Sequence, residues 1–468
     1  SRGVLQAAAV IGHNFSLGLL EHVSGLSSEQ VMLAMEDLER YYLVRPDMRG
    51  SPDAYAFIHE KFREVLLKEL SPARRRLLHQ RTAQALHTTP PGKAGAQAAV
   101  LAGHYYAAGD IRQAYSMWLE AATYARSLQS LPEAYSAYQH ADDLLPHLAS
   151  TLAADDIYSL YGPWGEAASE ISDAPMMQRV YSAMHGFGKQ HHSPLLLGAG
   201  LSGLSYLAYF QHDFRGALDL VQQGMRYLEQ TNNPFERIQA YIRFGNLLTL
   251  SSRLEEAIQL FQHAISMGEN TVDERTVSAS LLAADWLALV YILSGWPEKA
   301  VEMASQTMRA RQMQLQASEN IRNMFTYCAG LYFSGQFQKA LELCQSGLKL
   351  TERMGAMREN AVFHFFASAS NFGLADLDQA WEHAQEAFRL AEHIGYKEVA
   401  SVALGVQGDL FSLGDIDKAV DTYQRGISSN IHPLVGSAYI PYRLAHATAR
   451  SGALSEGAAL IEKTLEYT

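Results

Sequence analysis

The sequence predicts an all-α protein in which a small N-terminal domain precedes a superhelix of antiparallel helix pairs. Three observations support this fold class. A segment of about 40 residues recurs along the chain, small residues stand at fixed points of each copy, and the first seventy residues show short helical patterns interrupted by two strand patterns. A repeat array also suits a chain of 468 residues, which is too long for one compact core.

The repeat is clearest at its turns, where one helix ends in small and polar residues and the next helix opens with an alanine. The turns read FQHDFRGALDL, LSSRLEEAIQL, LSGWPEKAVEM, FSGQFQKALEL, GLADLDQAWEH, SLGDIDKAVDT and RSGALSEGAAL, and an earlier copy reads YAAGDIRQAYSM. The small residue that marks each copy is Ala114, Ala217, Ala257, Ala300, Ala340, Ala380, Ala419 or Gly457, and from Ala217 onward the spacings are 40, 43, 40, 40, 39 and 38 residues.

Two further positions repeat with these marker residues. Seven residues after the markers stand Ala121, Gly224, Ala264, Thr307, Gly347, Ala387, Gly426 and Thr464, and twelve residues before them stand Ala102, Ser205, Gly245, Ala288, Cys328, Ser368, Gln407 and Ala445. Every one of these except Gln407 is small. Small side chains allow two helices to approach closely, so the pattern predicts helix pairs that bury one another's faces.

These registers resemble the tetratricopeptide repeat (TPR), which also has small residues at these points and a glycine at the turn. The turn glycines would be Gly109, Gly295, Gly335, Gly414 and Gly452. The period near 40 is longer than the usual one and is similar to the TPR-like superhelices of bacterial signalling ATPases of the maltose-regulon activator type. The chain departs from the pattern by mostly lacking the closing proline and by an irregular stretch from about 130 to 195.

The N-terminal domain shows three helical patterns and then a hairpin. VLQAAAVIG, SLGLLEHVSG and SSEQVMLAMEDLERYYLV have apolar residues at helical spacing, and Ser27 and Ser28 offer an N-cap for the third helix. YYLVRP and AYAFI read as strands joined by DMRGSPD, whose Gly50 and Pro52 suit a turn. HEKFREVLLKEL follows, and Ser71-Pro72 opens a further helix. This order predicts a winged-helix-like domain at 1–70, a helical linker with the first helix pairs at 71–195, and the superhelix at 196–468.

A winged helix often binds DNA, but the charges disfavour that function here. The expected recognition helix carries Glu29, Glu36, Asp37 and Glu39 against Arg40, and the whole chain has a net charge of −12. Phosphates would repel such a surface. The main basic cluster runs from residue 61 to residue 81 and is interpreted either as a solvated helix face or as a docking face for a neighbouring domain.

The N-terminal order, with FIHEKFREVL at the strand-to-helix junction, resembles the region that follows the nucleotide-binding domain in STAND-class signalling ATPases. In that family a histidine at this junction, in a Met-His-Asp motif, contacts the β-phosphate of bound ADP. Ile58-His59-Glu60 matches the motif with two substitutions. The resemblance therefore implies that His59 senses nucleotide, but only together with an NTPase domain. The alternative is that His59 is a partly buried histidine that caps local backbone.

No catalytic or cofactor site is expected within this chain. TPPGKAG lacks the first glycine and the Ser/Thr of a phosphate loop, His191-His192 has no metal-ligand spacing, and GLSGLS is not a nucleophile motif. Cys328 and Cys344 do not form a CxxC pair and are expected to be small core residues in a reducing cytoplasm. We expect ADP or ATP only in the suspected parent protein, and neither an enzyme nor a metal site here.

The start of the chain and the lengths of its apolar runs lead to expectations about the parent protein and its location. SRGVLQAAAVIG has neither a signal-peptide pattern nor an initial Met, and it begins within a predicted helix, so we expect a piece of a longer protein. No apolar run approaches the roughly 18–20 residues that span a bilayer. We therefore expect a cytoplasmic location and no membrane contact.

Partner binding is predicted on the concave face of the superhelix, which the first helix of each pair should line. Counting back from the marker residues selects an aromatic surface with isolated polar groups, suited to a peptide segment or a small apolar ligand. The alternative for several of these aromatic residues is packing between repeats. The predicted groove comprises Tyr206, Tyr209, Asn246, Asp285, Arg322, Phe325, Tyr332, Phe365, Phe372 and Phe411.

The resulting hypothesis is a non-catalytic sensor arm. The superhelix would bind a protein, peptide or small-molecule trigger and would relay binding to an upstream NTPase domain, with an oligomer forming only on activation. The alternatives are a constitutive scaffold for protein–protein interaction and, less favoured by the charges, a winged-helix transcription regulator. Nucleic-acid binding by the superhelix is not expected.

Overall fold

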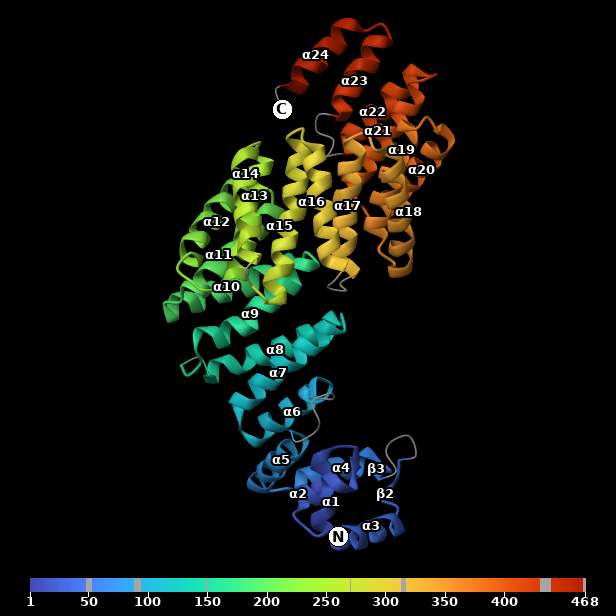
Figure 1. Cartoon of the computed structure of the whole chain (residues 1–468). Helices are drawn as coiled ribbons and strands as arrows, with labels where there is room; N and C mark the ends of the chain where they lie inside the picture. The colour runs from blue at the N-terminus through green and yellow to red at the C-terminus, as the bar shows by residue number, and fades with distance from the viewer. Residues whose placement is uncertain are drawn as a thin grey trace. The chain divides into compact units, whose positions relative to one another are not determined.

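The computed structural model describes residues 1–47, 53–87, 94–148, 150–269, 271–312, 317–429 and 439–465. These residues form 24 α-helices and three short strands (Figure 1). The chain divides into two compact units, Ser1–Leu197 and Gly198–Thr468, called unit 1 and unit 2 below. The predicted turn residues Gly50 and Pro52 and most of TPPGKAG lie outside the described residues.

Unit 1 opens with helices arranged around a three-stranded antiparallel sheet. The strand order is β1-β3-β2, with Phe15 opposite Tyr55 and Val44 opposite Phe57. The sequence did not reveal β1, because three residues are too few to show strand alternation. The elements are α1 (Arg2–Ile11), β1 (Asn14–Ser16), α2 (Leu17–Ser24), α3 (Ser28–Arg40), β2 (Val44–Pro46), β3 (Ala54–Phe57), α4 (Glu60–Glu69) and α5 (Pro72–His87).

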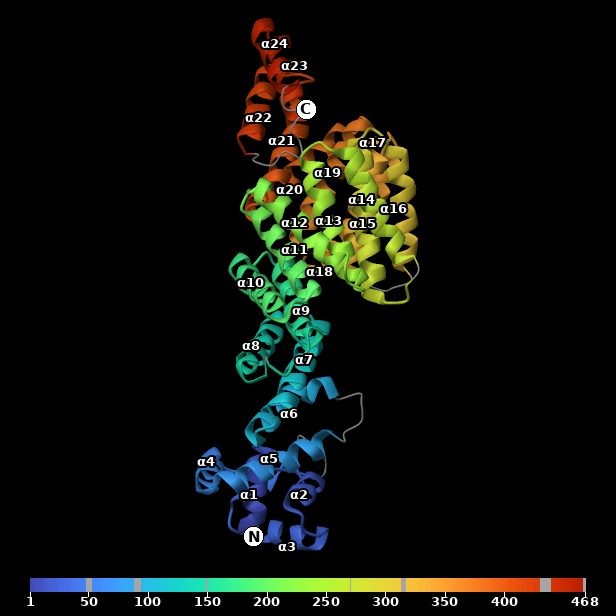
Figure 2. The same cartoon turned by 90° about the vertical axis from the view of Figure 1, so that its left-hand side faces the viewer.

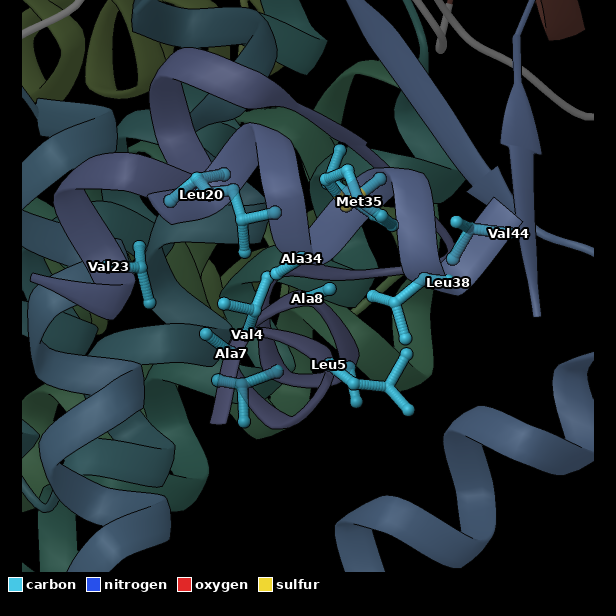
Figure 3. Packing of buried hydrophobic residues seen from close by; sticks show 14 of the residues in the cluster. Val4, Leu5, Ala7, Ala8, Leu20, Val23, Ala34, Met35, Leu38 and Val44 are labelled. Atoms are coloured by element: carbon cyan, nitrogen blue, oxygen red, sulfur yellow. The ribbon is translucent and has the colours of Figure 1, made fainter. Parts of the chain in front are cut away.

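The core of this region forms around α1, whose residues from Val4 to Val10 are all buried. Its run of alanines lets α2, α3, α4 and α5 approach it closely. Figure 3 shows side chains from α1, α2 and α3, including Leu20 and Met35, pointing toward one another. This order of elements is the basis for interpreting the region as winged-helix-like.

The predicted helix starts are confirmed. Ser27 caps α3 by accepting from the backbone N–H of Gln30, whose side chain in turn accepts from the N–H of Ser27. Pro72 is the first residue of α5, and the hydroxyl of Ser71 accepts from the N–H of Arg74 at 3.4 Å.

The remainder of unit 1 is helical throughout its described residues. The stretch from about 130 to 195, in which the repeat pattern of the sequence is irregular, consists of well-formed helices. The repeat pattern was hidden there because larger residues such as Met177 occupy buried positions that hold alanine elsewhere. The helices are α6 (Ala94–Ala108), α7 (Ile111–Ser127), α8 (Leu131–Leu148), α9 (Ala154–Glu170) and α10 (Ala174–His191).

Unit 2 is a TPR-like superhelix of antiparallel helix pairs, as predicted. Figure 1 shows its helices following one another in chain order. The pairs are α11 (Pro194–Phe210) with α12 (Phe214–Leu228), α13 (Pro234–Leu250) with α14 (Leu254–Gly268), α15 (Glu274–Leu293) with α16 (Pro297–Gln312), α17 (Ala317–Phe333) with α18 (Phe337–Met354), α19 (Met357–Gly373) with α20 (Leu377–His393), α21 (Lys397–Phe411) with α22 (Ile416–Ser429), and α23 (Tyr439–Arg450) with α24 (Leu454–Leu465).

The small residues allow close helix contact both within a pair and between neighbouring pairs. Every marker alanine has an exposed fraction of 0%. A Cβ added at Gly245 would lie 2.6 Å from the ring of Phe261, and one at Gly347 would lie 2.5 Å from the ring of Phe363. The hydroxyl of Ser368 also donates to the carbonyl oxygen of Ala380 at 2.6 Å. Close helix contact therefore leaves no room for larger side chains.

The turn within most pairs has a left-handed residue five positions before the marker. Among the predicted turn glycines, Gly109, Gly295, Gly335 and Gly452 have positive φ. Gly414 does not adopt this conformation. In three other copies the left-handed residue is His212, Ser252 or Ala375, so the backbone geometry recurs where the glycine does not.

One described helix, α15, is long and apolar enough to cross a membrane by length and composition. This is an exception to the expectation from sequence. In the structure 56% of its apolar window is buried, and it packs against α13, α14, α16 and α17. These contacts are those of a core helix in the superhelix.

Candidate functional site

The predicted groove residues all lie on the first helices of the pairs, α11, α13, α15, α17, α19 and α21. The surface that these helices share is called the first-helix face below. Seven of the predicted residues are aromatic, and all seven are half-buried, with one part of each ring packed and another accessible. The structure separates the ten residues into groups with different surroundings.

The first group lies between α11 and α13. Tyr206 and Tyr209 have nearly parallel rings with centroids 6.2 Å apart, and Phe210 meets the edge or face of Tyr206 at 4.7 Å. The guanidinium of Arg243 lies 5.6 Å from the Tyr206 ring centroid and donates to the hydroxyl of Ser202 at 2.7 Å. An aromatic surface is thus combined with a positioned cation.

The second group lies between α17 and α19. The buried ring of Phe366 is its centre, with Phe365, Phe325 and Tyr332 at centroid distances of 4.8, 5.5 and 6.1 Å. These contacts show that inter-repeat packing, the alternative considered above, holds Phe325 and Tyr332 in place. Because both rings stay half-exposed, the same packing fixes them as a preorganised apolar surface.

Polar groups flank the aromatic groups. Arg322 is exposed on α17. The side-chain oxygen of Asn246 is buried and accepts no hydrogen bond among the described residues. A ligand N–H could satisfy that acceptor, because an unpaired buried amide oxygen is unfavourable.

Asp285 does not line the face as predicted. It is 3% exposed, lies 2.8 Å from a guanidinium nitrogen of the equally buried Arg311, and accepts from the side-chain amide of Asn323 at 2.8 Å. Burial raises the pKa of Asp285, whereas Arg311 and Asn323 oppose that shift. Asp285 therefore links α15, α16 and α17 inside the superhelix.

Phe411 also has surroundings that the sequence did not suggest. Its ring meets Trp381 of α20 at 5.1 Å, and the ammonium group of Lys418 of α22 lies 4.1 Å from its centroid. Both neighbours belong to second helices. Phe411 and the more isolated Phe372 therefore do not join either aromatic group.

Charged residues that were not predicted also act on this face. The pKa of Tyr209 is raised, first by burial and then by Tyr206 and the carboxylate of Glu398. Glu398 belongs to α21, five pairs further along the chain than Tyr209, so the superhelix brings these helices within electrostatic range. Burial and Asp409 raise the pKa of Tyr332, and Arg443 lowers it. Sequence spacing along one helix cannot reveal such contacts.

A separate cavity of about 390 Å³ lies among α20, α21 and α22. It is mainly polar and is distinct from the two aromatic groups. Its lining residues are Phe388, Glu392, Leu404, Asp421, Gln424, Arg425 and Ser428.

His59 is exposed at the junction between β3 and α4. It occupies the N-cap position, but its side chain makes no capping hydrogen bond, so it is not the partly buried cap that was considered as an alternative. Its ring centroid lies 5.8 Å from that of Phe62. Beside it, a ring nitrogen of His13 and a carboxylate oxygen of Glu60 are 2.9 Å apart.

Other titratable clusters are structural in their geometry. No group of three or more His, Cys, Asp or Glu side chains that could hold a metal ion occurs in the part of the chain that the structure describes. Cys328 and Cys344 are buried with their sulfur atoms 3.5 Å apart, and burial raises the pKa of Cys328 well above its usual value. This environment disfavours a reactive thiolate.

Comparisons with known proteins match structures but not sequences. No protein-family model matches the chain, and no curated protein matches it. Similar solved structures include the apo form of RapI, with 11% identity over 75% of this chain and 97% of that one and a TM-score of 0.55. A Rap protein complexed with competence and sporulation factor has 15% identity over 67% of this chain and 88% of that one, with a TM-score of 0.52.

A third similar structure is a STAND protein with a tetratricopeptide repeat sensor from Pyrococcus horikoshii, with 13% identity and a TM-score of 0.46. The match covers 99% of this chain and 62% of that protein, so this chain spans less than two thirds of its length. At these identities the likeness concerns the fold. This chain thus shares its helical superhelix with proteins of known structure.

Proposed function

We propose that unit 2 binds an extended peptide segment of a partner along the first-helix face. The observation that carries this proposal is the pair of fixed, half-exposed aromatic groups on α11 and on α17 with α19. Large rigid side chains supply buried area with little loss of conformational entropy, and they dominate many protein interfaces.

The polar groups fit a peptide better than a small apolar ligand. The side-chain oxygen of Asn246, which has no partner among the described residues, offers an acceptor for a backbone N–H, while Arg243 offers a cation beside Tyr206 and Arg322 an exposed cation on α17. The Rap structure that resembles this fold contains a bound factor, which supports a binding role for a superhelix of this kind.

In the complete protein, peptide binding would be relayed to an NTPase domain, for which this chain supplies the sensor arm. The exposed His59 supports this part of the proposal, because its imidazole makes no capping hydrogen bond and can donate to a phosphate oxygen. ADP or ATP would then be a ligand of the parent protein. A constitutive scaffold is the second candidate, and it predicts the same groove without any effect of nucleotide.

Selection from a displayed library of random peptides tests the binding surface. Wild-type chain should enrich a family of related peptides, and Phe325→Ala/Phe365→Ala should reduce their affinity by at least about 30-fold, since each of the two truncations removes roughly 1–3 kcal/mol at a hot spot. Leu293→Ala/Leu413→Ala is a matched control, because both residues are exposed and lie outside the aromatic groups. Equal binding by all three folded proteins would refute the groove.

The nucleotide role of His59 has its own test. In the full-length parent, His59→Ala should release ADP faster and raise basal output, whereas in this chain alone it should change stability by less than about 0.5 kcal/mol. Wild-type ADP retention by the variant would contradict the sensor role. An output that responds neither to peptide nor to His59→Ala would favour the constitutive scaffold.

A further inference from the structure

Two charged helix faces of unit 1 play no part in the proposed function. The first is the outer face of α3, on which Glu29, Met32, Leu33, Glu36 and Arg40 are all exposed. Met32 and Leu33 are 54% and 58% exposed, although both are large and apolar. In Figures 1 and 2 no other helix lies beyond α3 at the edge of unit 1.

The α3 face continues into the two residues that follow the helix. Tyr41 and Tyr42 are 72% and 78% exposed, the latter in a left-handed conformation. Clustered exposed apolar side chains rimmed by charges are typical of protein-binding surfaces. Glu29 and Glu36 form no ion pair with any described residue, so the rim has unpaired negative charge.

The second face is the start of α5. Arg74, Arg75 and Arg76 are exposed, form no ion pair among the described residues, and precede Leu77, which is 45% exposed. Helix α5 contains no acidic residue. Its surface thus pairs unneutralised guanidinium groups with an apolar side chain.

The start of α5 carries charge that the helix's own dipole opposes. The N-terminal end of a helix favours anions, yet the three arginines stand in the first two turns of α5. Departures from such local rules are expected at functional sites.

We propose that two copies of this chain associate head to tail, with the α3 face of one copy on the Arg74–Arg76 start of α5 in the next. The faces are complementary in sign, and each brings exposed apolar side chains to the contact. Because the two surfaces differ, the contact is heterologous, and each copy keeps one face free for a further copy.

Sedimentation velocity of the full chain tests this contact. The weight-average mass should rise above the monomer value of 51.8 kDa with concentration at low ionic strength, and it should fall back at roughly tenfold higher salt. Glu29→Gln/Glu36→Gln and Arg75→Gln/Arg76→Gln should each weaken association at least tenfold. An equimolar mixture of the two variants should form a 1:1 dimer and stop there, since one intact contact remains.

Matched controls separate this contact from a general charge effect. Lys349→Gln/Arg353→Gln removes the same charge as the α5 variant from an exposed part of α18 and should associate like wild type. A wild-type chain that stays monomeric at low salt would overturn the proposal. So would association that the α3 and α5 variants leave unchanged, or a mixture that remains monomeric while each variant keeps its helical circular dichroism.

Discussion

The helix pairs of unit 2 and the first 87 residues of unit 1 are stabilised by contacts of different range. In unit 2 a buried small residue meets a helix that is only a short turn away, as Ser368 meets Ala380. In unit 1 the sheet pairs Phe15 with Tyr55, and α1 packs against helices from across the region. Local contacts leave a regular spacing in the sequence, whereas distant contacts do not.

The surfaces of the two regions differ as well. Unit 2 offers half-exposed aromatic groups fixed by inter-repeat packing, and the N-terminal region offers strongly charged helix faces. The difference suggests two kinds of recognition, one through buried aromatic area and one through complementary charge. The following predictions test the comparison from the largest expected effect to the smallest.

Breaking an ion pair should destabilise the protein far more in unit 2 than in unit 1, and this is the largest difference expected between the two units. Asp285→Ala leaves Arg311 buried without its carboxylate, and it should lower the free energy of unfolding by about 3–5 kcal/mol. Glu69→Ala removes the exposed partner of Arg2 in unit 1, and it should change stability by about 0–1 kcal/mol. Urea denaturation of both variants measures the contrast, and equal effects would contradict it.

In unit 2, an oversized residue at a helix contact should disturb only the neighbouring helix pairs. Ala340→Leu adds volume at a fully buried helix contact and should destabilise the protein by roughly 1–3 kcal/mol. Faster hydrogen exchange should be confined to α17, α18 and the adjoining pairs, because each repeat contacts only its neighbours. Ala8→Leu in α1 should instead expose the whole N-terminal core, and uniform exchange in both variants would refute this difference.

A close histidine pair occurs among the described residues of each unit. The Nδ1 atoms of His79 and His104 are 2.9 Å apart, and those of His364 and His383 are 2.8 Å apart. Burial is the main cause that lowers the pKa of His79, His104 and His364 to about 4, and it also lowers the pKa of His383.

The sign of the pH effect follows from these shifts. Unfolded histidines, with an ordinary pKa near 6.5, bind protons before the folded ones do. The folded protein should therefore lose stability as pH falls from about 6.5 to 4, and both units should contribute. His364→Gln/His383→Gln should flatten the decline for unit 2 alone, as followed by exchange in α19 and α20. An unchanged slope would show that other groups cause it.

The smallest effects concern the left-handed turn residues. Ser252→Gly and Ala375→Gly should stabilise unit 2 by up to about 1 kcal/mol, because glycine tolerates positive φ, although its greater freedom in the unfolded chain offsets part of the gain. Gly335→Ala should destabilise by about 1 kcal/mol. Thermal melts compare the three variants, and destabilisation by both glycine substitutions would contradict the account.

Much of the fold was predictable because the marker residues are set by local sterics. Ala217 and Ala340 must be small wherever two helices touch, and that requirement appears directly as a spacing. Strand β1 and the pairs near Met177 were missed because their residues follow no such local rule. The candidate site was less predictable: helical periodicity placed Phe325 on the correct helix but could not show that Asp285 turns inward to Arg311.

The missed site residues are those whose role depends on other repeats. Phe366 reads as core from its own helix, and only the packing of α17 against α19 makes it the centre of an aromatic group. Glu398 acts on Tyr209 from five pairs away, at a distance that depends on the curvature of the superhelix. Sequence patterns of one repeat cannot specify that curvature.

The central claim is that the first-helix face of unit 2 is the peptide-binding surface. Hydrogen–deuterium exchange of the wild-type chain, with and without a saturating library-selected peptide, tests it most directly. The claim predicts protection in the segments that contain Tyr206–Phe210, Phe325–Tyr332 and Phe365–Phe372, with no change in α3 or α5. Protection confined to unit 1, or to the cavity among α20, α21 and α22, would contradict it.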